Sequence, residues 1–583
     1  MKFLRNFLAA FLALIVFTGI GFVLFLVVVS AFSAEEKVSV SDKSILHLKL
    51  NRPISEVEFE NPFAEIGVIA TSPNTIGLVQ LKECIKNAKE DDKIEGIYLD
   101  ASFISAGSAT LEEIRLALED FKSSGKFIVS YAEYYSEAAY HLASVSDKIY
   151  MHPEGSLEFN GLSANLTFFK GLFDKLDIKP QIFRVGKYKS AIEPLIREDM
   201  SEENRAQMTS MLNSINGHLI NNVASGRKLS PEETKKMSDQ MLVRQPSDAV
   251  KYGLVDSLTY YDGVISYLKS TVGIEKDDEI DFIDYDKYKK SFSTYKSSKN
   301  EVAVIIASGE IVSGKGDMNT IGSESFVKEI RKAREDEEIK AVVLRINSPG
   351  GSFVASDVMW REIKLTSEVK PVVASMSDLA ASGGYYMSVA CDTIIAQPNT
   401  ITGSIGIFGV MFNFQDFMKN KLGITNEEVN TGEYSGMMTV TRPLTEQEAA
   451  IIQEDINQGY ETFVSKVAQG RGMSVEAVKE IASGRVWTGE QGKANGLVDI
   501  LGDFDDAIEV AAEMANLDDD YKVRYYPKQK SILEEFFKGL EGDTKAKAIQ
   551  AELGELYPFY ELLNKTKNLS GVQARLPYEL NLN

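Results

Sequence analysis

The sequence predicts an α/β protein made of two tandem copies of one unit, preceded by one apolar N-terminal segment. Short apolar strands alternate with amphipathic helical stretches along most of the 583 residues. Segments of the first half also recur in the second at a nearly constant offset of about 245 residues. IEGIYLD at Ile94 is answered by IKAVVLR at Ile339, and YGLVD at Tyr252 by NGLVD at Asn495. This recurrence indicates a tandem duplication.

The N-terminal segment is predicted to be a membrane anchor. Residues 1–6 carry Lys2 and Arg5, and residues 7–32 are almost entirely apolar and uncharged. Such a run is long enough to cross a bilayer as a helix, and the preceding positive charges favour a cytoplasmic N-terminus. Small residues between Ser30 and Ala34 leave a cleaved signal peptide open as the alternative, although the apolar run is longer than usual for one. We expect an uncleaved single-pass anchor.

The remaining chain divides into two repeats and a tail. Repeat one is expected over residues 44–292 and repeat two over 300–537, with a polar, lysine- and serine-rich stretch at the join. No role is predicted for the C-terminal tail, residues 538–583. The net charge of −22 argues against a nucleic-acid partner, because phosphate binding needs clustered Lys and Arg. Cys84 and Cys391 are too few for a disulfide framework and are expected in the core.

Ser382 is the candidate nucleophile. It lies in DLAASGGYY, after one strand-like run and at the expected start of a helix. There the helix dipole and the free N–H of Gly383 can form half of an oxyanion hole. Gly350 and Gly351 of the INSPGGS loop are the candidates for the other half. The alternative is that both glycine pairs only make tight turns.

A comparison of the two repeats predicts which residue accepts the proton of Ser382. Repeat one has Glu137 opposite Ser382 and DASFISAGS opposite INSPGGS, so it lacks both the serine and the glycine loop. Conversely, Lys189 in GKYKSAIEP lies opposite Ser435, so repeat two lacks the lysine. A serine nucleophile needs a base, and lysine can serve when burial lowers its pKa. A solvated surface lysine is the alternative.

The sequence gives little support for a histidine base or for a metal or other cofactor. All four histidines lie in repeat one, outside any recognisable triad setting, and are expected to pack or to lie on the surface. No metal motif such as HExxH occurs, so no metal or cofactor is expected. The sequence therefore predicts a site divided between the repeats.

These motifs resemble the signal peptide peptidase A family, in its long tandem-repeat form called protease IV. The resemblance is carried by VGKYKSAIEP, INSPGGS, DLAASGGYY, TGSIGIFG at residues 402–409 and RVWTGEQGKANGLVD at residues 485–499. It implies a Clp-protease/crotonase-like fold in each repeat and a serine–lysine dyad. The family's nucleophile motif falls on Ser382 and its base motif on Lys189, with backbone donors at Gly383 and Gly350.

The resemblance also implies a cellular role. It suggests a homotetramer on the periplasmic face of the bacterial cytoplasmic membrane that degrades cleaved signal peptides and other hydrophobic peptides. Ile405, Ile407 and Phe408 are expected to suit apolar substrates and to keep the lysine neutral. A crotonase-type acyl-CoA enzyme and a non-catalytic membrane scaffold are the competing functions. The first does not explain the anchor or the complementary losses in the two repeats. The cleavage-site preference stays open.

Overall fold

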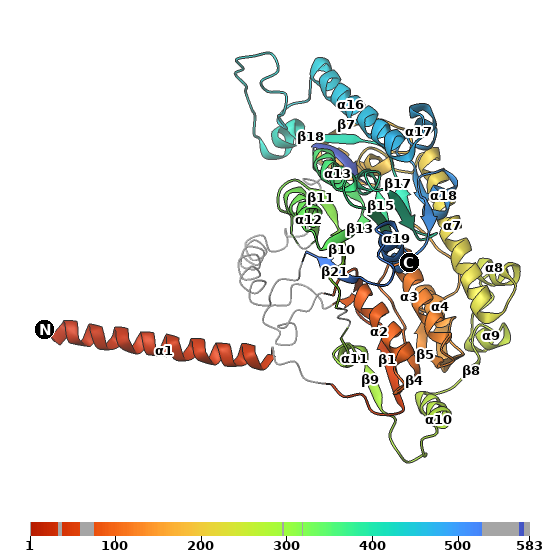
Figure 1. The fold of residues 1–583 in the computed structure, drawn as a ribbon. Coiled ribbons are helices and arrows are strands. Elements are labelled where there is room, and N and C mark those ends of the chain that lie inside the picture. The colour runs from red at the N-terminus through yellow and green to blue at the C-terminus, as the bar shows by residue number, and fades with distance from the viewer. Residues whose placement is uncertain are drawn as a thin grey trace.

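The computed structural model describes residues 2–32, 38–58, 75–293, 297–317, 319–527 and 571–575 (Figure 1). The predicted α/β class is confirmed. The elements of repeat one are β1 (Ser44–Lys49), β2 (Ile54–Ser55), β3 (Ile76–Gly77), α2 (Leu78–Glu90), β4 (Ile94–Asp100), α3 (Ser108–Lys122), β5 (Phe127–Tyr135), α4 (Glu137–Ala143), β6 (Lys148–Leu157), α5 (Lys170–Leu176), β7 (Lys179–Arg184), the 3-10 helix η2 (Ser190–Ile192), α6 (Glu193–Ile196), α7 (Glu202–Arg227), α8 (Pro231–Asp239), α9 (Pro246–Lys251), β8 (Ser257–Leu258), α10 (Tyr261–Val272), β9 (Phe282–Asp284) and α11 (Tyr285–Tyr288).

Repeat two follows a similar order of elements. They are β10 (Glu301–Ser308), β11 (Glu310–Val312), β12 (Thr320–Gly322), α12 (Ser323–Glu335), β13 (Ile339–Ser348), β14 (Gly350–Ser352), α13 (Phe353–Ser367), β15 (Val372–Ala381), α14 (Gly383–Ser388), β16 (Thr393–Ala396), β17 (Ile401–Gly403), β18 (Phe408–Asn413), α15 (Gln415–Phe417), the π-helix η3 (Met418–Leu422), α16 (Glu446–Arg471), α17 (Val475–Ile481), β19 (Val486–Thr488), α18 (Gly489–Ala494), β20 (Ile500–Leu501), α19 (Phe504–Met514) and β21 (Lys522–Tyr526). A last strand, β22 (Gly571–Arg575), comes from the tail.

The sheets show the duplication directly. In repeat one, parallel strands run in the order β9-β1-β4-β5-β6-β8, and in repeat two the equivalent parallel strands run β21-β10-β13-β15-β16-β20. Matching hydrogen bonds accompany this order. The hydroxyl of Tyr140 donates to Leu254 O, and in repeat two the hydroxyl of Tyr385 donates to Leu497 O. The two repeats therefore share one architecture.

The predicted anchor segment, residues 7–32, is helical. It belongs to helix α1 (Lys2–Phe32), which projects from the rest of the molecule in Figure 1. Some of its side chains lie outside the described residues, and among the described residues no helix is long and apolar enough to cross a membrane. Ser33 and Ala34 of the alternative cleavage site also lie outside the described residues, as does the tail except for β22.

The two repeats are joined by a shared sheet. Its order is β12-β11-β14-β22-β18-β7, so strand β7 of repeat one pairs antiparallel with β18 of repeat two. Asp378, at the start of the DLAASGGYY motif, adds a second link. Its carboxylate accepts hydrogen bonds from Ala109 N and from the backbone and hydroxyl of Thr110, at the N-terminus of α3. The serine motif of repeat two is thus held against repeat one.

A buried ionic cluster forms a third link between the repeats. The Arg345 guanidinium of repeat two lies 2.8 Å from carboxylate oxygens of both Glu56 and Glu113 of repeat one. Glu113 also pairs with Lys82 at 3.0 Å, and Lys82 reaches Asp503 of repeat two at 2.9 Å. Only 1% of Arg345 is exposed. Each buried charge therefore depends on partners from the other repeat.

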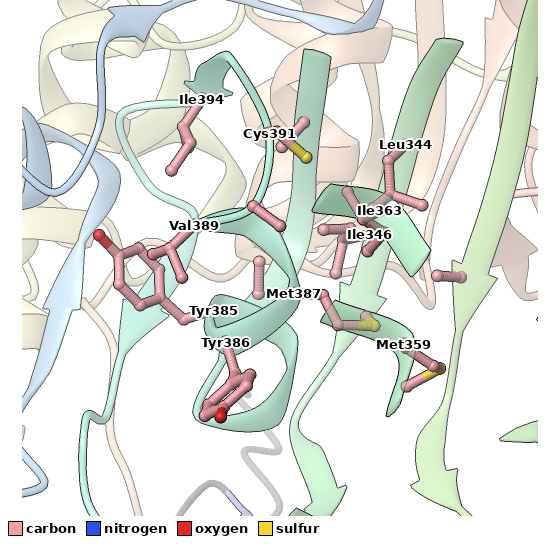
Figure 2. Close-up of a cluster of buried hydrophobic side chains, with 14 of the residues drawn as sticks. Leu344, Ile346, Met359, Ile363, Tyr385, Tyr386, Met387, Val389, Cys391 and Ile394 are labelled. Atoms are coloured by element: carbon pink, nitrogen blue, oxygen red, sulfur yellow. The ribbon is translucent and has the colours of Figure 1, made fainter. Parts of the chain in front are cut away.

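The helix that follows Ser382 is packed in a buried apolar core. Figure 2 shows Tyr385 and Tyr386 of α14 among buried side chains that include Ile346 of β13 and Met359 of α13. Cys391 belongs to the same cluster and is a free thiol, as is the buried Cys84. Both cysteines are core residues as predicted. The packing fixes the start of α14 relative to β13.

The ionic cluster predicts that substituting Arg345 strongly destabilises the folded protein. Arg345→Met should lower the free energy of unfolding by about 3 to 5 kcal/mol, because Glu56 would stay buried without its cation and Glu113 would keep only Lys82. Arg331→Met is the matched control, since Arg331 is half-exposed and its partner Glu362 keeps a second cation, Arg334. Denaturant unfolding of both variants should show the loss only for Arg345→Met. Equal midpoints for the two variants would contradict the role given to the cluster.

Candidate active site

Ser382 lies at the N-terminus of α14 with a strained backbone. Its φ of 55° and ψ of −111° lie in a region that residues with a side chain rarely adopt. The conformation is held by the hydrogen bond from Ser382 N to Gly403 O at 2.8 Å and by the packing of α14. Such strained turns between a strand and a helix are typical of nucleophiles, because they hold the side chain in one orientation.

Lys189 reaches the site on a loop of repeat one that packs against repeat two. Tyr188 N donates to Ser483 O at 3.0 Å. A side chain on Gly484 would place its Cβ only 2.6 Å from Lys189 Cβ, so the close approach requires glycine there. Gln207 braces the same loop, since its amide donates to Tyr188 O and to Ser190 Oγ. The lysine is therefore positioned by contacts from both repeats.

The structure brings the two predicted residues into hydrogen-bond contact. Lys189 Nζ lies 2.9 Å from Ser382 Oγ, although 193 positions separate them in the chain. The amine also contacts Ser404 O at 3.2 Å and Ser404 Oγ at 3.0 Å, while the Ser404 hydroxyl can donate to Gly484 O. A neutral amine has two N–H groups and one lone pair. If the N–H groups donate to Ser404, the lone pair is left for the hydroxyl of Ser382.

The surroundings of Lys189 favour this neutral form. Both Lys189 and Ser382 are completely buried. Burial alone lowers the pKa of the Lys189 amine well below its usual value of 10.5. No ion pair to Lys189 occurs among the described residues, and the Phe408 ring lies 6.0 Å from Nζ. These surroundings favour the neutral amine over the charged ammonium form.

The predicted oxyanion residues gather beside Ser382. A Cβ on Gly350, whose φ is +95°, would lie 2.6 Å from Gly383 N, so the glycine loop and the start of α14 are in close contact. The Gly350 N–H donates to Ser348 Oγ at 3.2 Å in this structure. Gly351 lies in β14, where it pairs with Ala574 of β22. Gly350 and Gly351 thus lie in an interior strand of the shared sheet, and Gly383 contacts this strand from the start of α14.

The structure places the other predicted residues and shows one contact that the sequence did not predict. Ile405, Ile407 and Phe408 are buried, and the Phe408 ring lies 6.0 Å from Lys189 Nζ. The Phe408 backbone also pairs with Gln573 of β22. Ser404 was not singled out, although it lies in the TGSIGIFG motif; a serine in a glycine-rich segment carries no signal of a contact so distant in sequence. His141 is buried beside Glu112, in agreement with a packing role.

Comparison with known proteins agrees with this geometry. The sequence profile of Peptidase family S49 matches residues 120–275 and 364–518, once in each repeat. Protease 4 of Salmonella typhi is 36% identical over 492 residues, which cover 82% of this chain and 78% of that protein. Protease 4 of Haemophilus influenzae is 34% identical over 524 residues, which cover 87% of this chain and 85% of that protein. The chloroplastic serine protease SPPA of Arabidopsis thaliana is 37% identical, covering 76% of this chain and 66% of the plant protein. The chain therefore belongs to peptidase family S49 and is a serine peptidase.

Proposed function

We propose that this peptidase uses Ser382 and Lys189 as a catalytic dyad and degrades cleaved signal peptides and other hydrophobic peptides. The observation that supports it most is the 2.9 Å contact between Lys189 Nζ and Ser382 Oγ, with both groups buried. A structural lysine would be expected to pair with a carboxylate, since unpaired buried charges are costly. A neutral lysine facing a strained serine suits proton transfer instead.

The proposed reaction follows serine-peptidase chemistry. Neutral Lys189 accepts the proton of Ser382, and Ser382 Oγ attacks the peptide carbonyl carbon. The N–H groups of Gly383 and of the loop with Gly350 and Gly351 stabilise the oxyanion. The lysine then protonates the leaving amine and activates the water that hydrolyses the acyl-enzyme. An acyl-CoA enzyme would have no need for the lysine at this position.

The cellular setting is also part of the proposal. The apolar helix α1 would anchor the chain in the bacterial cytoplasmic membrane, with residues 44–292 and 300–537 as two Clp-protease/crotonase-like repeats on the periplasmic side. Four copies would form the homotetramer that the family resemblance implies. The signal-peptide substrates rest on the same resemblance and on the name of another relative, the putative signal peptide peptidase SppA of Enterococcus faecium.

Removing either dyad residue should abolish activity. Ser382→Ala and Lys189→Ala should each lower hydrolysis of a hydrophobic peptide by at least about 1000-fold, because nucleophile and base act as one unit. Circular dichroism and gel filtration should show an unchanged fold and assembly. Lys187→Ala is the matched control, since Lys187 is exposed and lies two positions away. Activity surviving in either dyad variant would contradict the proposal.

The pH profile should report the buried lysine. Because Lys189 must be neutral to accept a proton, kcat/KM should rise with pH through the lysine pKa and level off above it. Burial lowers that pKa, so the rise is expected in the pH range well below 10.5 and not at 10.5. The profile should be the same in Lys187→Ala. A rate that does not change across this range would argue against a lysine base.

Ser404 should position the lysine. Ser404→Ala removes one acceptor of the amine, so kcat should fall by about 100-fold through misorientation while KM stays near the wild-type value. Ser388→Ala is the matched control, because it removes another buried hydroxyl, one that bonds only within α14. Steady-state kinetics of both variants should be used to measure kcat and KM. Equal kcat values would show that Ser404 has no role in orienting Lys189.

A further inference from the structure

A short segment of repeat two reaches both sides of the proposed dyad. Residues 485–488, named here the RVWT segment, open the RVWTGEQGKANGLVD motif and contain neither dyad residue. Most of the segment is strand β19, which pairs antiparallel with β17 in a register that includes Gly403. Gly403 O accepts a hydrogen bond from Ser382 N, and Arg485 O accepts one from Ser404 N, each at 2.8 Å. The RVWT segment therefore supports the nucleophile and the serine that contacts the lysine.

The same segment is tied to the lysine loop of repeat one through Gln207 of α7. Val486 N donates to Gln207 Oε1 at 3.3 Å. The amide nitrogen of Gln207 donates to Tyr188 O at 3.1 Å and to Ser190 Oγ at 2.8 Å. Tyr188 and Ser190 are the chain neighbours of Lys189. Both flanks of the lysine are thus linked to the RVWT segment.

Arg485 adds a second link, which runs through the ring of Tyr188. Its guanidinium carbon lies over two aromatic rings, 4.1 Å from the Trp487 centroid and 5.2 Å from the Tyr188 centroid. Trp487 is itself fixed, because its indole N–H donates to Ile481 O at 2.9 Å. Lys187 also lies over the Tyr188 ring, at 5.3 Å, but it belongs to the same loop. Arg485 therefore connects the Tyr188 ring to a fixed part of repeat two.

The two ring contacts are the main interactions of the Arg485 side chain. Within the part of the chain that the structure describes, Arg485 forms no ion pair, and its buried Nε has no hydrogen-bond partner. An arginine that only balanced charge would be expected beside a carboxylate. A guanidinium is planar and weakly hydrated, so it stacks on aromatic faces in a geometry that a lysine ammonium does not match. The surroundings of Arg485 thus favour a role based on its planar shape.

We propose that Arg485 is a positioning residue for Lys189 and acts through Tyr188. The inference rests on the proposed dyad. Tyr188 precedes Lys189 directly, so a fixed ring also fixes the backbone from which the lysine side chain extends. The contact of Lys189 Nζ with Ser382 Oγ measures 2.9 Å. A backbone displacement of about 1 Å would take the amine out of good hydrogen-bond geometry and slow proton transfer.

Steady-state kinetics on a hydrophobic peptide tests the role of Arg485. Arg485→Met should lower kcat about 30-fold while KM stays near the wild-type value, because the guanidinium orients the base and does not contact substrate. Arg485→Lys should lose as much, since it keeps the charge but not the planar group. Arg184→Met is the matched control, because Arg184 is exposed at the end of β7. A wild-type kcat in Arg485→Met or in Arg485→Lys would overturn the proposal.

Variants of Tyr188 test the same contact without a change in β19. Tyr188→Phe should keep the wild-type kcat, because the ring contacts Arg485, whereas Tyr188→Leu should lose about as much as Arg485→Met. The double variant Tyr188→Leu/Arg485→Met should be no slower than either single variant, since both changes remove one shared contact. Losses that multiply in the double variant, or an equal loss in Tyr188→Phe, would contradict the proposal. Should Arg485→Met fail to fold, the two Tyr188 variants decide alone.

The dyad variants separate this inference from the proposed function. If Ser382→Ala and Lys189→Ala are inactive while Arg485→Met and Tyr188→Leu keep the wild-type kcat, the inference is wrong and the dyad stands. If Lys189→Ala keeps wild-type activity, the dyad is wrong and the inference falls with it.

Discussion

The contact between Lys189 and Ser382 is the interaction on which the rest of the site depends. In the proposed mechanism the lysine acts without its proton, and burial of the amine favours this form. Such burial requires both repeats: repeat one supplies the loop with the lysine, and repeat two closes over it at Ser404 and Gly484. Neither repeat alone supplies the surroundings that favour the neutral amine.

The duplication accounts for a site whose two residues come from different repeats. Both repeats keep the same strand order and the same tyrosine-to-carbonyl hydrogen bond, so the framework is the same in both copies. The catalytic loops have diverged. The segment of repeat two opposite the lysine loop, Gly432–Val440, is largely exposed, and repeat one has Glu137 where the serine would be. The shared sheet and the Arg345 cluster link the two copies in the arrangement that brings Lys189 to Ser382.

The sequence predicted the α/β class, the duplication and the pairing of Ser382 with Lys189, because comparing the repeats showed what each one lacks. It did not predict Ser404 or β22. Contacts between residues so far apart leave no local pattern, and the short strand around Ala574 becomes recognisable only beside β14 and β18. Ile405 and Ile407, which were expected to suit apolar substrates, are buried in the loop between β17 and β18, and apolar residues of a core and of a peptide groove look alike in sequence.

The most direct test of the account is the site and rate of covalent labelling by a serine-directed fluorophosphonate. The label should be found by peptide mapping on Ser382, and labelling should be slowed by orders of magnitude in Lys189→Arg, because an arginine stays charged and cannot accept the proton. Labelling of another serine, or equal rates in wild type and Lys189→Arg, would contradict a dyad assembled across the two repeats.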